Sequence, residues 1–97
     1  MLFRSLVGTH THVPTADHRI LPGGTAYQTD CGMCGDYDSV IGMEKDAASD
    51  RFRGRSGARL SVAMGSPTLC GLLVEADLSG RATMVSPLRR GGALDPT

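Results

Sequence analysis

Short apolar runs separated by glycine and proline are the first pattern along the chain. Residues 2–7 are apolar apart from Arg4 and Ser5 and stop at Gly8, which predicts a short buried strand. Residues 25–29 carry β-prone side chains and predict a second strand. The segments 13–24 and 31–42 contain the intervening glycines and prolines, so we expect both to be loops.

The second half of the chain predicts one helix and three strands. Residues 43–52 carry apolar side chains three to five positions apart, and Gly54 follows, which predicts a helix that ends there. Residues 58–64, 69–77 and 81–88 predict strands. The last two strands are joined by Leu78-Ser79-Gly80 and should form a hairpin.

These elements indicate an α/β fold that is mostly strands with one helix. One helix cannot cover both faces of a sheet with this many strands, so the sheet should require more protein on one side. We expect residues 1–88 to form a portion of a domain. Residues 89–97 are rich in glycine, proline and charge and should form a flexible tail.

Charge and cysteine content indicate which classes of partner are excluded and in which cellular compartment the chain is expected. Ten basic and ten acidic residues cancel, so we expect neither a nucleic-acid duplex nor an acidic membrane surface as partner. No apolar run approaches the roughly 20 residues that cross a bilayer. Three cysteines argue against a secreted disulfide framework and favour the cytoplasm. A sheet face left uncovered would favour self-association into a homo-oligomer.

The segment Gly8-Thr9-His10-Thr11-His12 carries the sharpest chemistry. It follows the first predicted strand, and in α/β sheets ligands gather at the carboxyl ends of strands. In an extended chain, side chains two residues apart point the same way at about 7 Å, so His10 and His12 would face one metal ion. Imidazole suits Mn, Fe and Zn alike. The alternative is two histidines in a surface loop.

Cys31 and Cys34 form a C-x-x-C pair with three interpretations. With His10 and His12 the pair would complete a small zinc module, and by itself it would be a redox couple. The third interpretation is two small residues in a tight loop. Cys70 lies in an apolar run and is expected to be an inert core residue, and His18 is expected to be exposed.

A longer run around the histidines resembles a known family. The residues that carry the resemblance are Gly8-Thr9-His10-Thr11-His12-Val13-Pro14-Thr15-Ala16-Asp17, Arg19-Ile20-Leu21-Pro22-Gly23-Gly24-Thr25-Ala26-Tyr27, Thr29-Asp30, Gly32-Met33 and Tyr37-Asp38-Ser39-Val40-Ile41-Gly42. In this order they are similar to the C-terminal third of the YmdB-like calcineurin-type metallophosphoesterases. The likeness is close over residues 7–43 and looser elsewhere.

The resemblance implies a fold, a cofactor and a reaction. The fold would be the C-terminal part of a calcineurin-like metallophosphoesterase α/β sandwich. The family holds two divalent metals and hydrolyses phosphoesters, including 2',3'-cyclic nucleotides, and its Gly-Thr-His-Thr-His segment supplies two ligands that correspond to His10 and His12. The family's other ligands, and its proton-donating histidine, come from upstream segments that this sequence lacks. The resemblance therefore implies a fragment that is inactive alone.

Two further hypotheses come from other classes. The chain could be a truncated reading frame without catalysis that binds at most a metal or a partner subunit. It could instead be the zinc module of His10, His12, Cys31 and Cys34. Whether the chain is an enzyme is left open at this stage, since most ligands of the family it resembles are absent.

Overall fold

The computed structural model describes residues 3–54 and 59–97, in which strands predominate. The elements are β1 (Ser5–Val7), β2 (Arg19–Ile20), β3 (Ala26–Gln28), β4 (Gly35–Asp36), α1 (Lys45–Phe52), β5 (Pro67–Ala76) and β6 (Ala82–Arg90). The strands form two three-stranded sheets, ordered β1-β3-β2 and β4-β5-β6. The predicted α/β class, mostly strands with one helix in the described ranges, is confirmed.

The first sheet positions the histidine segment. β1 runs parallel to β3 with Leu6 opposite Tyr27, and β2 runs antiparallel to β3 with Ile20 opposite Ala26. β3 is thus the central strand, and its Ala26 and Gln28 side chains are buried. The chain leaves β1 at Val7 and enters the loop that holds both candidate ligands.

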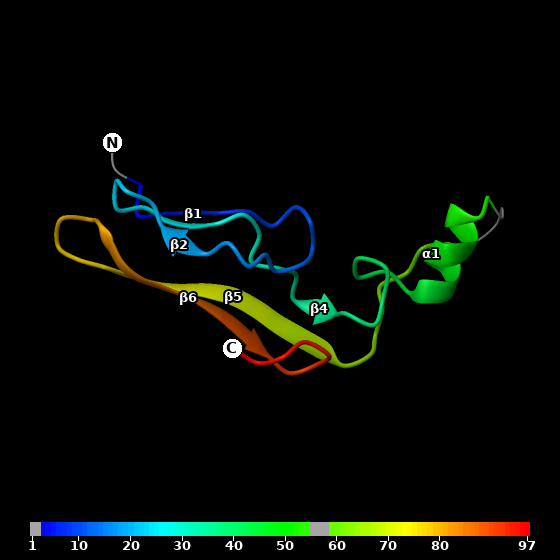
Figure 1. The fold of residues 1–97 in the computed structure, drawn as a ribbon. Coiled ribbons are helices and arrows are strands. Elements are labelled where there is room, and N and C mark those ends of the chain that lie inside the picture. Colours follow the sequence, from blue (N-terminus) through cyan, green and yellow to red (C-terminus); the bar gives the residue numbers. More distant parts are fainter. Residues whose placement is uncertain (1–2, 55–58) are drawn as a thin grey trace.

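The predicted hairpin forms and packs across the first sheet. β5 and β6 are antiparallel, with Cys70 opposite Arg89 and Val74 opposite Val85. On β5 the buried side chains, Thr68 and Cys70, come from alternate positions, as expected for a strand with one covered face, whereas on β6 only Ala82 is buried. The hairpin lies beside β2 and β3 in Figure 1, and the Ala82 N–H donates to the Gly24 carbonyl oxygen at 2.7 Å.

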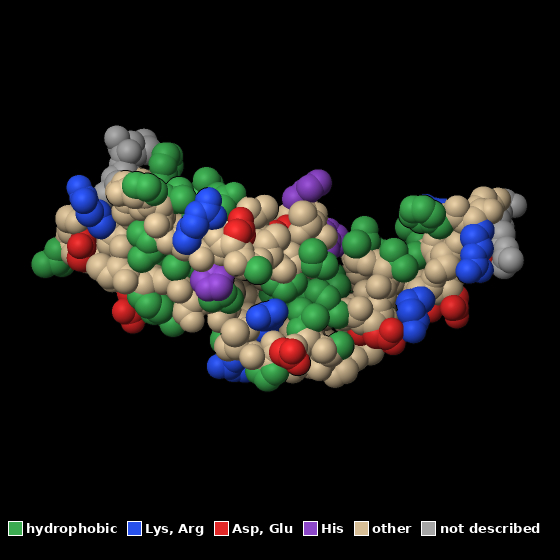
Figure 2. Space-filling view, viewed as in Figure 1, with side chains coloured by type: hydrophobic (Ala, Val, Ile, Leu, Met, Phe, Trp, Pro, Cys, Tyr) green, Lys and Arg blue, Asp and Glu red, His purple; other side chains and the backbone are tan. Residues whose placement is uncertain are grey.

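The core of the described chain is small and the molecule is elongated. Its principal extents are 55 × 26 × 17 Å and its radius of gyration is 16.8 Å. A compact domain of this length would have a radius of gyration of about 12.5 Å. The buried apolar residues are all small: Ala26, Ala48, Cys70 and Ala82. Large hydrophobic side chains such as Leu69, Leu73 and Phe52 are instead exposed, and Figure 2 shows hydrophobic side chains spread over the visible face.

The helix shows the same shortage of packing. α1 projects from one end of the molecule, away from the β1-β3-β2 sheet (Figure 1). Glu44 caps its first turn by accepting hydrogen bonds from the N–H groups of Asp46 and Ala47. Of the predicted apolar stripe only Ala48 is buried, whereas the Phe52 side chain is 91% exposed. No helix in the described ranges is long and apolar enough to span a membrane.

Several local predictions need correction. The strand expected to be buried at 2–7 forms at Ser5–Val7 but is exposed, because no described layer covers either face. Residues 59–64 form no strand and make only an isolated bridge at Val62, and residue 58 lies outside the described residues. Two-residue strands, β2 and β4, occur inside the expected loops.

The final strand also extends beyond its expected limit. β6 continues to Arg90, because Arg89 and Arg90 pair with Cys70 and Leu69 on β5. Thr97 then returns to exchange two backbone hydrogen bonds with Arg89, at 3.1 and 3.2 Å. The flexibility of residues 89–97 stays a prediction.

Candidate metal centre at the end of β1

The loop that follows β1 is anchored by one buried carboxylate, Asp30. The Asp30 side chain is fully buried and accepts hydrogen bonds from the Thr11 N–H at 2.5 Å, the Thr11 hydroxyl at 2.8 Å and the Gly32 N–H at 2.8 Å. The residue between the two histidines is therefore tied to the loop that leaves β3. In the sequence Asp30 belongs only to the stretch that resembles the family, and nothing in its spacing indicated this contact.

The same contacts determine the charge of Asp30. Burial by itself raises the pKa of the Asp30 carboxyl, but the hydrogen bonds from Gly32 and Thr11, together with nearby His12, bring that pKa below its usual value. The carboxylate is consequently ionised at neutral pH. An ionised, buried acceptor therefore lies beside the histidine segment and is bonded to Thr11 within it.

His12 has a defined orientation and a defined tautomer. Its Nδ1 lies 2.9 Å from the Ile41 carbonyl oxygen, and because a carbonyl only accepts, the Nδ1–H is the donor. A neutral ring with its proton on Nδ1 leaves the Nε2 lone pair free for a ligand. Metal-binding histidines in proteins are commonly oriented in this way by a backbone carbonyl.

The carbonyl that orients His12 belongs to a tight hairpin turn. Val40 and Met43 exchange backbone hydrogen bonds of 2.9 and 2.8 Å, and the two central residues, Ile41 and Gly42, both have positive φ, at 45° and 94°. Such turns favour asparagine and glycine, so a β-branched side chain at the first position is strained. Strain of this kind is typical of functional loops.

The extended geometry expected for the histidine segment is wrong. Residues 10–13 form bends, and His12 has φ of 68°, in the left-handed region. The reason is the pair of Asp30 contacts to Thr11, which turn the chain. His12 is half-buried and His10 is exposed, with no hydrogen bond of its side chain to any described residue.

Within residues 3–54 and 59–97, no three His, Cys, Asp or Glu side chains are arranged to hold a metal ion. The zinc module of His10, His12, Cys31 and Cys34 is therefore not assembled. Cys34 Sγ instead donates to the Cys70 carbonyl at 3.2 Å, and Cys31 Sγ faces the Gly32 carbonyl at 3.7 Å. Burial and then Asp30 raise the pKa of the Cys31 thiol, which disfavours the thiolate needed for metal or redox chemistry.

The remaining donor set fits a partial metal centre. A neutral imidazole with a fixed tautomer at His12 and an accessible imidazole at His10 are ligands that suit Mn, Fe or Zn. Two such ligands leave most coordination positions of a divalent ion unfilled by this chain.

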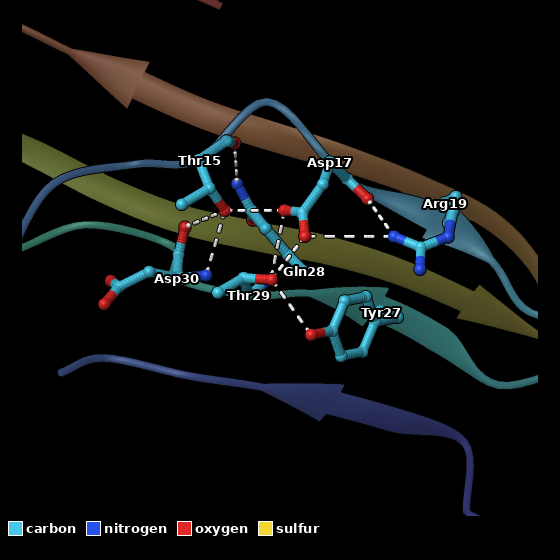
Figure 3. Close-up of polar contacts among 7 residues, drawn as sticks. All are labelled: Thr15, Asp17, Arg19, Tyr27, Gln28, Thr29 and Asp30. Atoms are coloured by element: carbon cyan, nitrogen blue, oxygen red, sulfur yellow. Dashed lines mark hydrogen bonds and ion pairs between the residues drawn. The ribbon is translucent and has the colours of Figure 1, made fainter. Parts of the chain in front are cut away.

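A second polar network ties the segment before β2 to the residues that follow β3 (Figure 3). The Thr15 hydroxyl donates to Asp17 at 2.6 Å and accepts from the Asp30 N–H at 3.0 Å. Asp17 also accepts from the N–H and the hydroxyl of Thr29, and its carboxylate lies 3.8 Å from Arg19 in a local ion pair. Hydrogen bonds from Thr15 and then Thr29 lower the pKa of Asp17 to about 2.

The network extends into the buried layer below the loop. Gln28 is buried and its Nε2 donates to the Thr15 carbonyl at 2.8 Å. His18, the third histidine, is exposed as expected. Short Thr-x-Asp spacing, as in Thr15-Ala16-Asp17, is the sequence signal from which the Thr15–Asp17 contact could have been found.

A groove of about 430 Å³ opens beside the turn that orients His12. Its walls are almost entirely apolar and come from the turn, α1 and the segment after it: Val40, Ile41, Met43, Ala48, Arg51, Phe52 and Leu60. Ile41 therefore belongs to both features, since its carbonyl contacts His12 and its side chain lines the groove.

Proteins of known structure share the fold of this chain over most of its length. A phosphatase of known structure from Mycoplasma pneumoniae is 37% identical, with a TM-score of 0.83 over 90% of this chain and 32% of its own. A hypothetical protein from Thermus thermophilus is also 37% identical, with a TM-score of 0.82 over 93% of this chain and 35% of its own. The metallophosphoesterase fold class predicted from the sequence is confirmed by this likeness.

Relatives found by sequence point to the same class of protein as the structural ones, since both include enzymes named for phosphoester hydrolysis. The chain is 51% identical over 73 residues to a 2',3'-cyclic-nucleotide 2'-phosphodiesterase from Bacillus subtilis (strain 168), which covers 75% of this chain and 28% of the relative. The chain thus spans little more than a quarter of that relative's length. A family model described as YmdB-like protein matches residues 3–88, and the chain belongs to this YmdB-like family.

Proposed function

We propose that this chain supplies two metal ligands, the imidazoles of His10 and His12, to a metal-dependent phosphodiesterase whose other ligands come from outside the chain. The observation that carries the proposal is the His12 Nδ1 contact to Ile41, which leaves Nε2 free for a ligand. The Bacillus subtilis relative, named as a phosphodiesterase, supports the reaction class.

Divalent metals in such a centre polarise the phosphoryl group and lower the pKa of a bound water. This chain's own residues do the positioning. Asp30 fixes the turn at Thr11, the Ile41 carbonyl holds the His12 ring, and the Asp17 network supports the returning loop. With only two ligands, the isolated chain binds metal weakly and does not turn over substrate.

The substrate class that suits this site is a phosphodiester carrying a base, such as a 2',3'-cyclic nucleotide. The name of the Bacillus subtilis relative supports it. So does the apolar groove, because Ile41 contributes its carbonyl to His12 and its side chain to the groove, where a base would lie against Ile41 and Phe52. Aromatic side chains stack on bases of any sequence. We place the reaction in the cytoplasm, where the thiols would stay reduced.

A chimera tests the proposal. Residues 3–88 would replace the matched segment of the Bacillus subtilis relative, and hydrolysis of 2',3'-cyclic AMP would be measured with added Mn²⁺. His10→Ala or His12→Ala should lower kcat/KM by at least about 100-fold, with a parallel loss of bound metal, because each removes a ligand. His18→Ala is the matched control and should leave both unchanged. Full activity and full metal content in both ligand variants would contradict the proposal.

A further inference from the structure

A second cavity lies between the loop before β2 and the hairpin strand β6. Its volume is about 350 Å³, which is within the range of small-molecule sites. Strand β6 lies beside β2 and β3, and the loop contributes Pro14 and Thr15 to the wall. Neither His10 nor His12 lines this cavity, and it shares no lining residue with the groove beside Ile41. The cavity is therefore separate from the candidate metal centre.

One buried acceptor at this cavity has no partner. Gln28, which lines the cavity from β3, is only 1% exposed. Its Nε2 donates to the Thr15 carbonyl oxygen at 2.8 Å (Figure 3), and because a carbonyl only accepts, the orientation of the amide is fixed. Gln28 Oε1 then has no hydrogen-bond donor among the described residues. Since a buried acceptor is unfavourable unless a donor reaches it, the cavity suits a ligand with an N–H or O–H group.

The wall on β6 supplies a positive charge with open donors. Arg89 is half-buried, and its Nε donates to the Thr97 hydroxyl at 2.7 Å, which orients the guanidinium. The terminal nitrogens Nη1 and Nη2 of Arg89 make no hydrogen bond or ion pair with another described residue. The neighbouring Arg90 differs, because its Nη1 donates to the carbonyl oxygens of Arg89 and Thr97. A guanidinium with open N–H groups matches the oxygens of a carboxylate or a phosphate.

The rest of the wall determines the body of the ligand. Most of it is apolar and comes from Pro14, Ala16, Val85 and Pro87. No aspartate or glutamate is among the described residues that line the cavity, so no acidic side chain in its wall opposes an anion beside Arg89. A ligand that fills the cavity would therefore carry its anionic group and its donor on a largely apolar body.

We propose that this cavity binds a small organic anion, a carboxylate or a phosphate, that also carries an N–H or O–H donor. The anion pairs with the Nη groups of Arg89, and the donor bonds to Gln28 Oε1. The inference is independent of the proposed function, because neither candidate metal ligand takes part. Since the ligand binds only the folded chain, it also raises the Tm.

Two matched probes, 4-aminobenzylphosphonate and 4-aminophenylacetate, test the site on the 97-residue chain. Both have an aromatic body with an N–H donor, and they differ in the anion. We expect at least one to bind saturably by ¹H–¹⁵N NMR, with shifts at the Gln28 side-chain amide and the Arg89 Nε–H, and the tighter probe identifies the anion. Benzylphosphonate and phenylacetate, which lack the amine, should bind at least about fivefold more weakly.

A pair of arginine variants tests the other half of the site. Arg89→Gln should raise the Kd of the bound amine probe at least about tenfold, because it removes the charge that pairs with the anion. Arg90→Gln is the matched control and should leave Kd unchanged, since Arg90 does not line the cavity. The amine-free probes need no variant, so they test the site even where Arg89→Gln fails to fold.

Three results would overturn the proposal. The first is that neither amine probe binds. The second is that loss of the amine leaves Kd unchanged, which would mean that no ligand donor reaches Gln28 Oε1. The third is that Arg89→Gln and Arg90→Gln bind the probe equally well, which would place the anion elsewhere on the surface.

Discussion

The loop around Asp30 and the outer faces of the sheets are built on opposite principles. Around Asp30, most polar groups are paired: the buried carboxylate has three donors, and Thr15, Asp17 and Thr29 bond to one another. Among the described residues, Gln28 Oε1 is the exception, since it is buried without a hydrogen-bond partner. On the outer faces, large apolar side chains such as Leu6 and Leu73 are exposed. The chain thus holds its histidine loop with its own residues but does not complete its own core. The hydrogen bonds around Asp30 join residues that are all within this chain, whereas burial of Leu6 and Leu73 would require more protein against the sheets.

The largest effect should come from removing the anchor of the polar region. Asp30→Ala leaves the Thr11 and Gly32 N–H groups without their acceptor and should lower the free energy of unfolding by roughly 2–4 kcal/mol. Chemical denaturation and amide exchange at Thr11 would measure it. Asp38→Ala, which removes an exposed pair with Lys45, should cost less than about 1 kcal/mol. Equal losses of unfolding free energy in Asp30→Ala and Asp38→Ala would contradict the view that the Asp30 contacts stabilise the chain more than an exposed ion pair does.

Acid should weaken the same region through Asp17. Its pKa is about 2 in the folded chain against an ordinary value of 3.8, so between those values the unfolded state takes up the proton first. The network's contribution is complete above about pH 4 and is lost as the pH falls towards 2. Carboxyl NMR titration should find the low midpoint, and Thr15→Val should move it upwards. An Asp17 midpoint near the ordinary value in the parent chain would contradict the network.

A smaller effect of opposite sign is expected at the strained turn. Ile41→Asn should stabilise the chain by about 1 kcal/mol, because asparagine tolerates positive φ and Ile41 is largely exposed. Gly42→Ala, at φ of 94° and with Met33 Sδ 3.3 Å from the added carbon, should destabilise it. Thermal unfolding of both variants gives the sign, and destabilisation by Ile41→Asn would show that the Ile41 side chain contributes packing.

The smallest change in stability is expected on the outer face. Leu6→Ser should alter the free energy of unfolding by no more than about 0.5 kcal/mol, since Leu6 is already exposed, but it should reduce binding of an apolar dye. Unfolding and dye fluorescence are measured on the same sample. A loss of several kcal/mol would mean that β1 is covered in the isolated chain.

Local signals predicted the elements that depend on local sequence. The hairpin of β5 and β6 and the helix α1 follow from apolar spacing and from turn residues, and they formed close to their expected limits. The burial of the first strand was not predicted correctly, because its apolar pattern is typical of an internal strand, whereas in the described residues β1 has only β3 beside it. The strand expected near Val62 failed because it found only Met43 as a partner.

The candidate site was predictable in its residues and not in its geometry. His10 and His12 followed from a short motif and from a family resemblance, and their role as ligands stays a prediction. The contacts that shape the loop are tertiary: Thr11 meets Asp30 across 19 residues, and His12 meets Ile41 across 29. No local pattern encodes a backbone carbonyl at that distance, so the bend at His12 was missed.

The most direct test of the account is a histidine ¹⁵N NMR titration of the chain with Zn²⁺. Before metal is added, His12 should carry its proton on Nδ1. With metal, the Nε2 resonance of His12 and a ring nitrogen of His10 should shift together with one apparent Kd, while His18 stays unchanged. A proton on Nε2 of His12, or shifts of His10 and His12 that are independent or no larger than those of His18, would contradict the paired-ligand account.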